Sequence, residues 1–183
     1  MDVRALYKIS YGLYIVTSVK SGTFSGQIAN TVFQVTAEPV KIAASINKEN
    51  TTHEFIENSK VFAVSVLAKD TPMQFIGRFG FRSSRNFNKF EGVRYRIGKT
   101  GAPIVLDNSV AYVEARVVGS CDAGTHTLFI GEVVDADLIS DKEVMTYEYY
   151  HSIKGKVPKT ATVYKTVACK TSPFRGCPII PNF

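Results

Sequence analysis

A series of short apolar segments, rich in β-branched and aromatic residues, dominates the sequence. Such segments are typical of β-strands, and they cover residues 11–19, 28–36, 40–46, 61–67, 110–120 and 126–138. Turn-forming residues separate them, and no regular alternation with helices is present, which disfavours a doubly wound α/β sheet. The pattern predicts a mainly β protein, an antiparallel barrel with short helical insertions.

Two short helices are expected between these strands. Thr51 and Glu54 have the spacing of a capping box, in which the hydroxyl accepts from a backbone N–H and the carboxylate reaches back to the helix start. Pro72, at the first helical position, marks the start of the second helix, and Phe75 and Phe79 place apolar groups on one side of it.

The length of 183 residues, 45% of them hydrophobic, suits one domain with a sizeable core. We assign residues 1–165 to this domain and expect the proline-containing residues 166–183 to form an irregular C-terminal tail. The N-terminal segment carries Asp2 and lacks the apolar stretch of a signal peptide, and no run of about 18 apolar residues occurs. A cytoplasmic protein with no membrane association is expected.

The net charge of +6 is segmented rather than spread along one stripe. Between Arg78 and Lys99 there are seven basic residues and one acid, Glu91. Between Lys154 and Arg175 there are six basic residues and no acid. No nucleic-acid-binding motif accompanies these segments, so no nucleic-acid partner is expected, whereas two basic patches suit a small ligand that carries phosphate.

Metal and Rossmann-type nucleotide sites are disfavoured. The three histidines, His53, His126 and His151, lie far apart in the sequence, and the three cysteines form no C-x-x-C pair. No Walker or G-x-G-x-x-G loop is present. We therefore expect no metal site.

Two polar clusters are candidate phosphate sites. The stretch "ASINKENTTHEFI" places Lys48 and several hydroxyl and amide groups at the start of the first expected helix, where the helix dipole favours an anion. The alternative is that Thr51 only caps its helix and the other residues are ordinary loop polarity. A second cluster, Arg82 to Arg85, adds hydroxyls and guanidinium groups that bind phosphate in two-point fashion.

With both clusters identified, the sequence resembles the flavin reductase-like proteins with an FMN-binding split β-barrel. The likeness is greatest to flavoredoxins and to the flavin reductase part of high-molecular-weight rubredoxins. It covers about residues 7–164, through "YGLYIVTS", "GQIANTVFQVT", "SINKENTTHEFI", "FGFRSSRNFNKF", "TGAPI", "GTHTLFIGEV" and "MTYEYYHSIKGKVPKTA". The resemblance implies an antiparallel Greek-key split β-barrel that forms a homodimer, with one FMN per subunit near the dimer interface.

The resemblance also assigns site residues. The isoalloxazine ring is expected against Asn30, Thr31, Gln34, Val35 and Thr36. The phosphate is expected among Ser45, Asn47, Lys48, Thr52, Ser83, Ser84 and Arg85. His126 is expected to face the flavin and the nicotinamide as the catalytic residue, the alternative being a structural strand-end histidine, and Tyr164 is expected to cover the flavin.

The chain departs from the family pattern in its second loop. The family's Ser-Gly-Arg-Asp is replaced by Ser83-Ser84-Arg85-Asn86, which we expect to preserve phosphate binding. No rubredoxin module with paired C-x-x-C motifs follows Tyr164, so no iron centre is expected.

The resemblance implies an NAD(P)H:flavin oxidoreductase that passes electrons from NADH or NADPH through FMN to a flavin, iron or protein acceptor. The alternative is a flavoredoxin-type electron carrier that is reduced by a redox protein partner and has no nicotinamide site. A non-redox FMN-binding barrel is the third class.

Overall fold

The computed structural model describes residues 2–153. A 3-10 helix η1 (Val3–Lys8) precedes the sheet. The strands are β1 (Tyr14–Lys20), β2 (Thr23–Ala29), β3 (Val32–Ala37), β4 (Val40–Asn47), β5 (Val61–Leu67), β6 (Tyr95–Ile97), β7 (Pro103–Val105), β8 (Ser109–Asp122) and β9 (His126–Leu138). The helices are α1 (Thr51–Ser59), α2 (Met73–Gly80) and α3 (Tyr147–Ile153).

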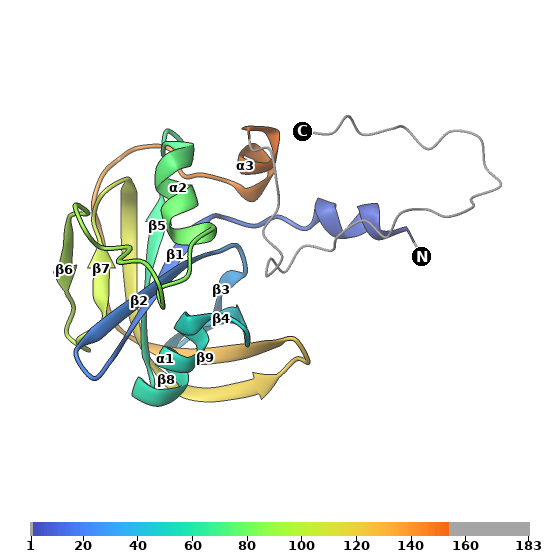
Figure 1. Ribbon diagram of the computed structural model, residues 1–183. Helices are drawn as coiled ribbons and strands as arrows, with labels where there is room; N and C mark the ends of the chain where they lie inside the picture. The colour runs from blue at the N-terminus through green and yellow to red at the C-terminus, as the bar shows by residue number, and fades with distance from the viewer. Residues whose placement is uncertain (1, 154–183) are drawn as a thin grey trace, which may run out of the picture.

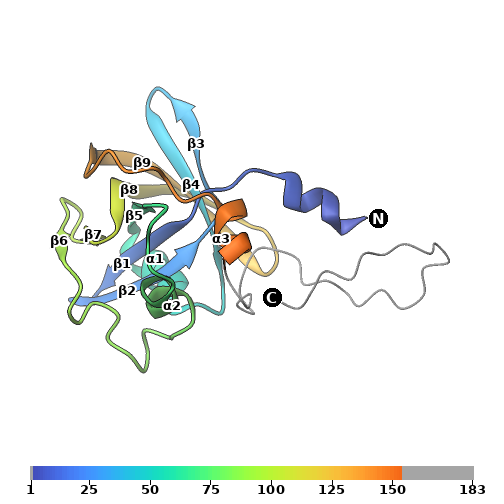
Figure 2. The ribbon, with the colours of Figure 1, turned by 90° about the horizontal axis from the view of Figure 1, so that it is seen from above.

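Seven strands form one antiparallel sheet in the order β2-β1-β5-β8-β9-β4-β3, and β6 and β7 form a separate pair. The sheet curves into a partly open barrel (Figure 1), with α1 packed against β1 and α2 against β2. Figure 2 shows the β3–β4 hairpin projecting from the rest of the sheet. The predicted fold class, a mainly β split barrel with short helical insertions, is confirmed.

Several strands differ from the sequence prediction: β6 and β7 were not predicted, and β1 begins at Tyr14 rather than at residue 11. The segment 28–36, predicted as a single strand, is divided between β2 and β3, and most of β2 was not predicted. Its sequence "TFSGQIA" contains few β-branched residues, because β2 is buried through small and polar groups. A Cβ at Gly26 would lie 3.2 Å from Phe79 and from Thr17, so glycine lets α2 pack closely on this strand.

Both predicted helices form, but their starts differ in detail. Asn50, rather than Thr51, is the N-cap of α1, and it makes no side-chain capping bond. The predicted capping box is therefore wrong: Glu54 accepts a hydrogen bond from Lys20 instead of reaching back to the helix start. Pro72 lies at the N-cap of α2, one position before the first helical residue.

The core lies between the curved sheet and the two longer helices. Residues of β1, β4, β5 and β9 meet α1 around Ile56, Phe62 and Phe129, and a second cluster joins β1 to α2 around Leu13 and Phe79. Within residues 2–153, no helix is both long enough and apolar enough to cross a membrane. The ends of β2 and β4, the starts of β9 and α1, and the loop after α2 converge at one cavity.

Candidate functional site

An open cavity of about 250 Å³ lies where these segments meet. Its walls combine polar residues from the strands and helix ends with a set of aromatic rings. The polar set is Gln27, Asn30, Ser45, Asn47, Glu49, Asn50, Thr51, Thr52, Arg82, Ser83, Ser84, Lys89 and His126, and the aromatic set is Phe79, Phe81, Tyr147 and Tyr150.

The cavity gathers about half of the residues that the sequence predicts for the flavin site. Those that line it are Asn30, Ser45, Asn47, Thr52, Ser83, Ser84 and His126. Those that do not line it are Thr31, Gln34, Val35, Thr36, Lys48 and Arg85. Tyr164 lies outside the described residues. The two predicted phosphate clusters, 31 or more residues apart along the chain, therefore share one cavity through their hydroxyl-bearing members.

A chain of hydroxyl groups connects the walls of the cavity. Thr52 Oγ1 at the start of α1 lies 2.9 Å from Ser25 Oγ on β2. Ser25 Oγ–H donates to Ser84 Oγ, 3.1 Å away, in the loop after α2. Because hydroxyls both donate and accept, they offer donors to a ligand oxygen with small rotations. The first turn of α1 borders the same space, and its backbone N–H groups and dipole favour an anion there.

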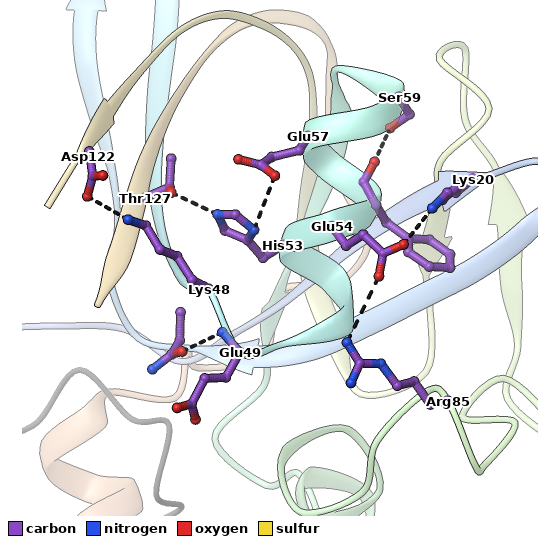
Figure 3. Close-up of polar contacts among 12 residues, drawn as sticks. Lys20, Lys48, Glu49, His53, Glu54, Glu57, Ser59, Arg85, Asp122 and Thr127 are labelled. Atoms are coloured by element: carbon purple, nitrogen blue, oxygen red, sulfur yellow. Dashed lines mark hydrogen bonds and ion pairs between the residues drawn. The ribbon is translucent and has the colours of Figure 1, made fainter. Parts of the chain in front are cut away.

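The two cations that the sequence assigns to the phosphate have other partners. Lys48 Nζ donates to Asp122 Oδ1 at 2.7 Å, and its side chain is 39% exposed. Arg85 lies 4.0 Å from Glu54 and is 64% exposed. Figure 3 shows both side chains directed to these carboxylates, on opposite sides of α1.

Gln27 is a buried polar residue of the cavity that the sequence reasoning missed. Its side chain is 8% exposed, and among the described residues its Oε1 has no hydrogen-bond partner. An unsatisfied buried acceptor costs free energy, so a donor from a ligand would be stabilising there. Gln27 belongs to the "GQIAN" segment that contributes to the family resemblance, so the sequence did contain a sign of its role. It was missed because the strand on which it lies was not predicted.

Lys89 is the second missed residue. It is 4% exposed, and its Nζ donates to Gly26 O at 2.7 Å and to Phe79 O at 2.8 Å. Burial lowers the pKa of Lys89 from its ordinary value to about 8. In the sequence, Lys89 is only one of seven basic residues between Arg78 and Lys99, so its burial could not be recognised.

Two histidines lie close to the start of β9 in different surroundings. His126 is half-buried, lines the cavity, and has its Nδ1 2.9 Å from Thr125 Oγ1. His53 on α1 is buried outside the cavity, with its Nε2 2.7 Å from Thr127 Oγ1 (Figure 3). Burial lowers the pKa of His53, against the opposing effect of Glu57. Of the two, only His126 is placed to touch a ligand in the cavity.

Metal coordination is a further possibility for clustered acids and histidines. Within residues 2–153, no three His, Cys, Asp or Glu side chains gather in the manner of a metal site. The cavity itself presents hydroxyls, amides, cations and aromatic rings to a ligand.

Comparison with known proteins shows the family to which the chain belongs. Residues 6–157 match the family model of the flavin reductase like domain. The chain is 62% identical over 165 residues to a ferric-chelate reductase (NAD(P)H) of Archaeoglobus fulgidus, covering 90% of this chain and 98% of that protein.

Two further proteins extend the comparison. The chain is 50% identical over 165 residues to a high molecular weight rubredoxin of Moorella thermoacetica, covering 90% of this chain and 72% of that protein. The solved NADH:FAD oxidoreductase of Streptomyces globisporus superposes with a TM-score of 0.71 at 26% identity, covering 78% of this chain and 84% of that one. The chain belongs to the flavin reductase-like family of oxidoreductases.

Proposed function

We propose that this protein is an NAD(P)H-dependent oxidoreductase that binds FMN in the cavity between β2, β4, α1 and the loop after α2. The observation that carries the proposal is the hydroxyl chain of Thr52, Ser25 and Ser84 beside the N-terminus of α1. This arrangement suits a terminal phosphate monoester, whose oxygens accept several hydrogen bonds.

The rest of the cavity fits a flavin. Gln27 Oε1, a buried acceptor, suits an N–H or O–H donor of the ring or of the sugar chain. Tyr147, Tyr150 and Phe81 supply aromatic surface for a flat ring. A bound flavin would accept a hydride from reduced nicotinamide and pass electrons onward. The residues of the chain bind and orient the reactants, and His126 at the cavity wall positions the nicotinamide.

A homodimer is part of this proposal. The cavity of about 250 Å³ is smaller than the roughly 300–1,000 Å³ typical of ligand sites, and it is open. The β3–β4 hairpin exposes Phe33, Val35 and Val40, and the expected ring-binding residues Gln34 and Val35 lie on it (Figure 2). A second subunit that covers this hairpin would bury the apolar groups and enlarge the flavin site. Sedimentation of the wild type and of Phe33→Asp tests this: a monomeric wild type would contradict it.

An electron carrier reduced by a redox protein partner is the second candidate. The 50% identity to a high molecular weight rubredoxin supports it, because the name of that protein points to electron transfer. In this case the protein would bind FMN without oxidising NAD(P)H.

One anaerobic experiment separates the candidates. The purified protein is loaded with FMN, mixed with NADH or with NADPH, and flavin bleaching is followed with time. Rapid bleaching is expected for the oxidoreductase, and absence of bleaching with both nucleotides would assign the protein to the electron carriers. Binding of FMN, FAD and riboflavin is measured in parallel. Riboflavin affinity equal to that of FMN would contradict the phosphate site.

A further inference from the structure

The end of α2 and the loop after it carry three arginines, Arg78, Arg82 and Arg85, which together form what we call the arginine face. Arg78 is partly exposed, and Arg82 and Arg85 are exposed. Within residues 2–153, Arg78 and Arg82 form no ion pair, and Arg85 lies 4.0 Å from its carboxylate partner Glu54 (Figure 3). Residues 78–90 contain no acidic residue, so positive charge dominates this face.

Other exposed cations of the described chain are paired more closely. Three lysines each have a carboxylate at 2.7 Å, in the pairs Lys48–Asp122, Lys69–Glu143 and Lys142–Asp70. The arginine face is therefore a local excess of positive charge rather than part of these surface ion pairs.

The ring of Phe87 holds two of the arginines in place. The guanidinium carbon of Arg82 lies 4.3 Å from the centre of this ring, and that of Arg78 lies 5.8 Å from it. Arg78 Nη1 also donates to the backbone oxygen of Glu91. A ring contact uses none of the five N–H donors of a guanidinium group, so both arginines retain donors for carboxylates. Because their positions are fixed in advance, less entropy is lost when a partner binds.

The arginine face begins at the mouth of the proposed flavin cavity and continues beyond it. Phe81 and Arg82 are exposed and also line the cavity. Arg78 lines neither this cavity nor the second hollow beneath the loop 84–91. A cation that served only a ligand inside the cavity would border it, which Arg78 does not. Arginine and exposed aromatic residues are the types enriched where proteins bind one another.

We propose that the arginine face docks an acidic electron-transfer protein at the mouth of the flavin cavity. This inference rests on the proposed function and adds to it the surface and the partner for the outgoing electrons. Carboxylates of the partner pair with Arg78 and Arg82, and Phe81 is covered beside them. Each acceptor molecule takes one electron, so two acceptor molecules oxidise one reduced flavin, and the protons of the flavin pass to water.

The test follows the oxidation of the FMN-loaded protein by acceptors of different charge. The flavin is first photoreduced in the absence of NAD(P)H, so the result does not depend on nicotinamide oxidation. The probes are plastocyanin, an acidic copper protein, cytochrome c, a basic haem protein, and benzoquinone, a small neutral acceptor. Rapid-mixing absorbance gives the second-order rate constant for each probe at low and at higher salt. Division by the benzoquinone rate corrects for any change in the flavin itself.

Arg78→Gln and Arg82→Gln each remove one charge from the face. At low salt, each should lower the corrected rate with plastocyanin by about threefold, and the double variant by about tenfold, because opposite charges speed the encounter. The loss should shrink at higher salt, where ions screen the charges. The corrected rate with cytochrome c should rise instead, because a repelling charge is removed. Arg82 is exposed, so Arg82→Gln tests the inference even if Arg78→Gln does not fold.

Lys60→Gln is the matched control. It removes an exposed lysine at the C-terminal end of α1, whereas the cavity lies at the N-terminal end of that helix. The corrected rates of this variant should stay close to those of the wild type. Equal losses in Lys60→Gln and in the arginine variants would show that only the net charge acts, and the inference would be wrong.

The remaining outcomes separate this inference from the function on which it rests. If plastocyanin oxidises the wild type and both arginine variants at the same corrected rate, the docking surface is wrong and the flavin site stands. If the arginine variants instead are bleached more slowly by NADPH, the arginines serve the nucleotide, which also overturns the inference. Failure of the wild type to bind FMN would contradict both proposals.

Discussion

Lys48 Nζ lies 2.7 Å from Asp122 Oδ1, in an ion pair between the turn after β4 and the end of β8. The pairing draws the lysine away from the cavity that its neighbours Asn47 and Thr52 line. Lys48, which the sequence predicts for the phosphate site, thus lies in an exposed ion pair in this structure.

The first prediction follows from this ion pair. Lys48→Met and Arg85→Met should each weaken FMN binding less than about fivefold, because both side chains are exposed and screened by water and salt. Fluorescence titration with FMN in moderate salt measures the change. A loss well beyond tenfold in either variant would show that its side chain turns into the cavity when the ligand binds.

The second prediction concerns His126. His126→Ala should slow anaerobic flavin reduction by NAD(P)H about tenfold or more, because hydride transfer depends steeply on the position of the donor. FMN occupancy and melting temperature should change little, since the side chain is half-buried at a strand end. Rapid-mixing absorbance measures the rate.

His53→Gln is the control for His126. It disturbs a buried histidine bonded to Thr127, one residue along β9, and should lower the free energy of unfolding by about 1–3 kcal/mol without a selective kinetic effect. If His126→Ala melts early and reduces flavin at the wild-type rate, His126 is a structural residue.

The third prediction concerns Gln27. Gln27→Met removes a buried acceptor that has no partner among the described residues, so the flavin-free protein should be as stable as wild type or more stable, by up to about 2 kcal/mol. FMN and riboflavin should both bind more weakly, because the donor on the ligand loses its acceptor. Chemical denaturation and flavin titration give the two quantities. Reduced stability together with unchanged flavin affinity would contradict a ligand-binding role.

The fourth prediction is structural and concerns Glu114. This carboxylate is fully buried and accepts hydrogen bonds from Lys99 N at 2.8 Å, from Thr100 N at 2.5 Å and from the Thr100 hydroxyl. Glu114→Gln turns an amide NH₂ toward these donors and should lower the free energy of unfolding by about 2–3 kcal/mol. Glu143→Gln, at an exposed ion pair with Lys69, should have little effect on the same urea denaturation curve.

The fifth prediction is the pH dependence of stability. The pKa of Lys89 is lowered to about 8 by burial, so between about pH 8 and its unfolded value of roughly 10.4 the unfolded chain binds more protons than the folded one. The cost of burying the charge is fully present below pH 8 and is relieved as pH rises. Relative to Lys89→Met, the flavin-free wild type should gain up to about 1.4 kcal/mol per pH unit in this range. A constant difference between the two proteins would show that Lys89 does not titrate there.

Much of the sheet follows from local sequence. The predictions for β5 and β9 match residue for residue, and those for β4 and β8 differ only at the ends, because their dense β-branched residues suit a buried strand. Most of β2 was not predicted, because its small and polar residues have low strand propensity. They suit the close packing against α2 and the border of the cavity instead.

The sequence also predicts two groups of ligand donors from residue type and local spacing. They are the polar turn after β4 and the hydroxyls of the loop after α2. The sequence does not show which group each charged side chain contacts. Lys48 meets Asp122 across 74 residues of chain, and Lys89 meets the carbonyl of Gly26 across 63. Such pairings depend on which groups the folded sheet brings together and on how much water reaches them. Tertiary structure alone therefore decided that Lys48 pairs with an exposed carboxylate and that Lys89 is buried against backbone carbonyls.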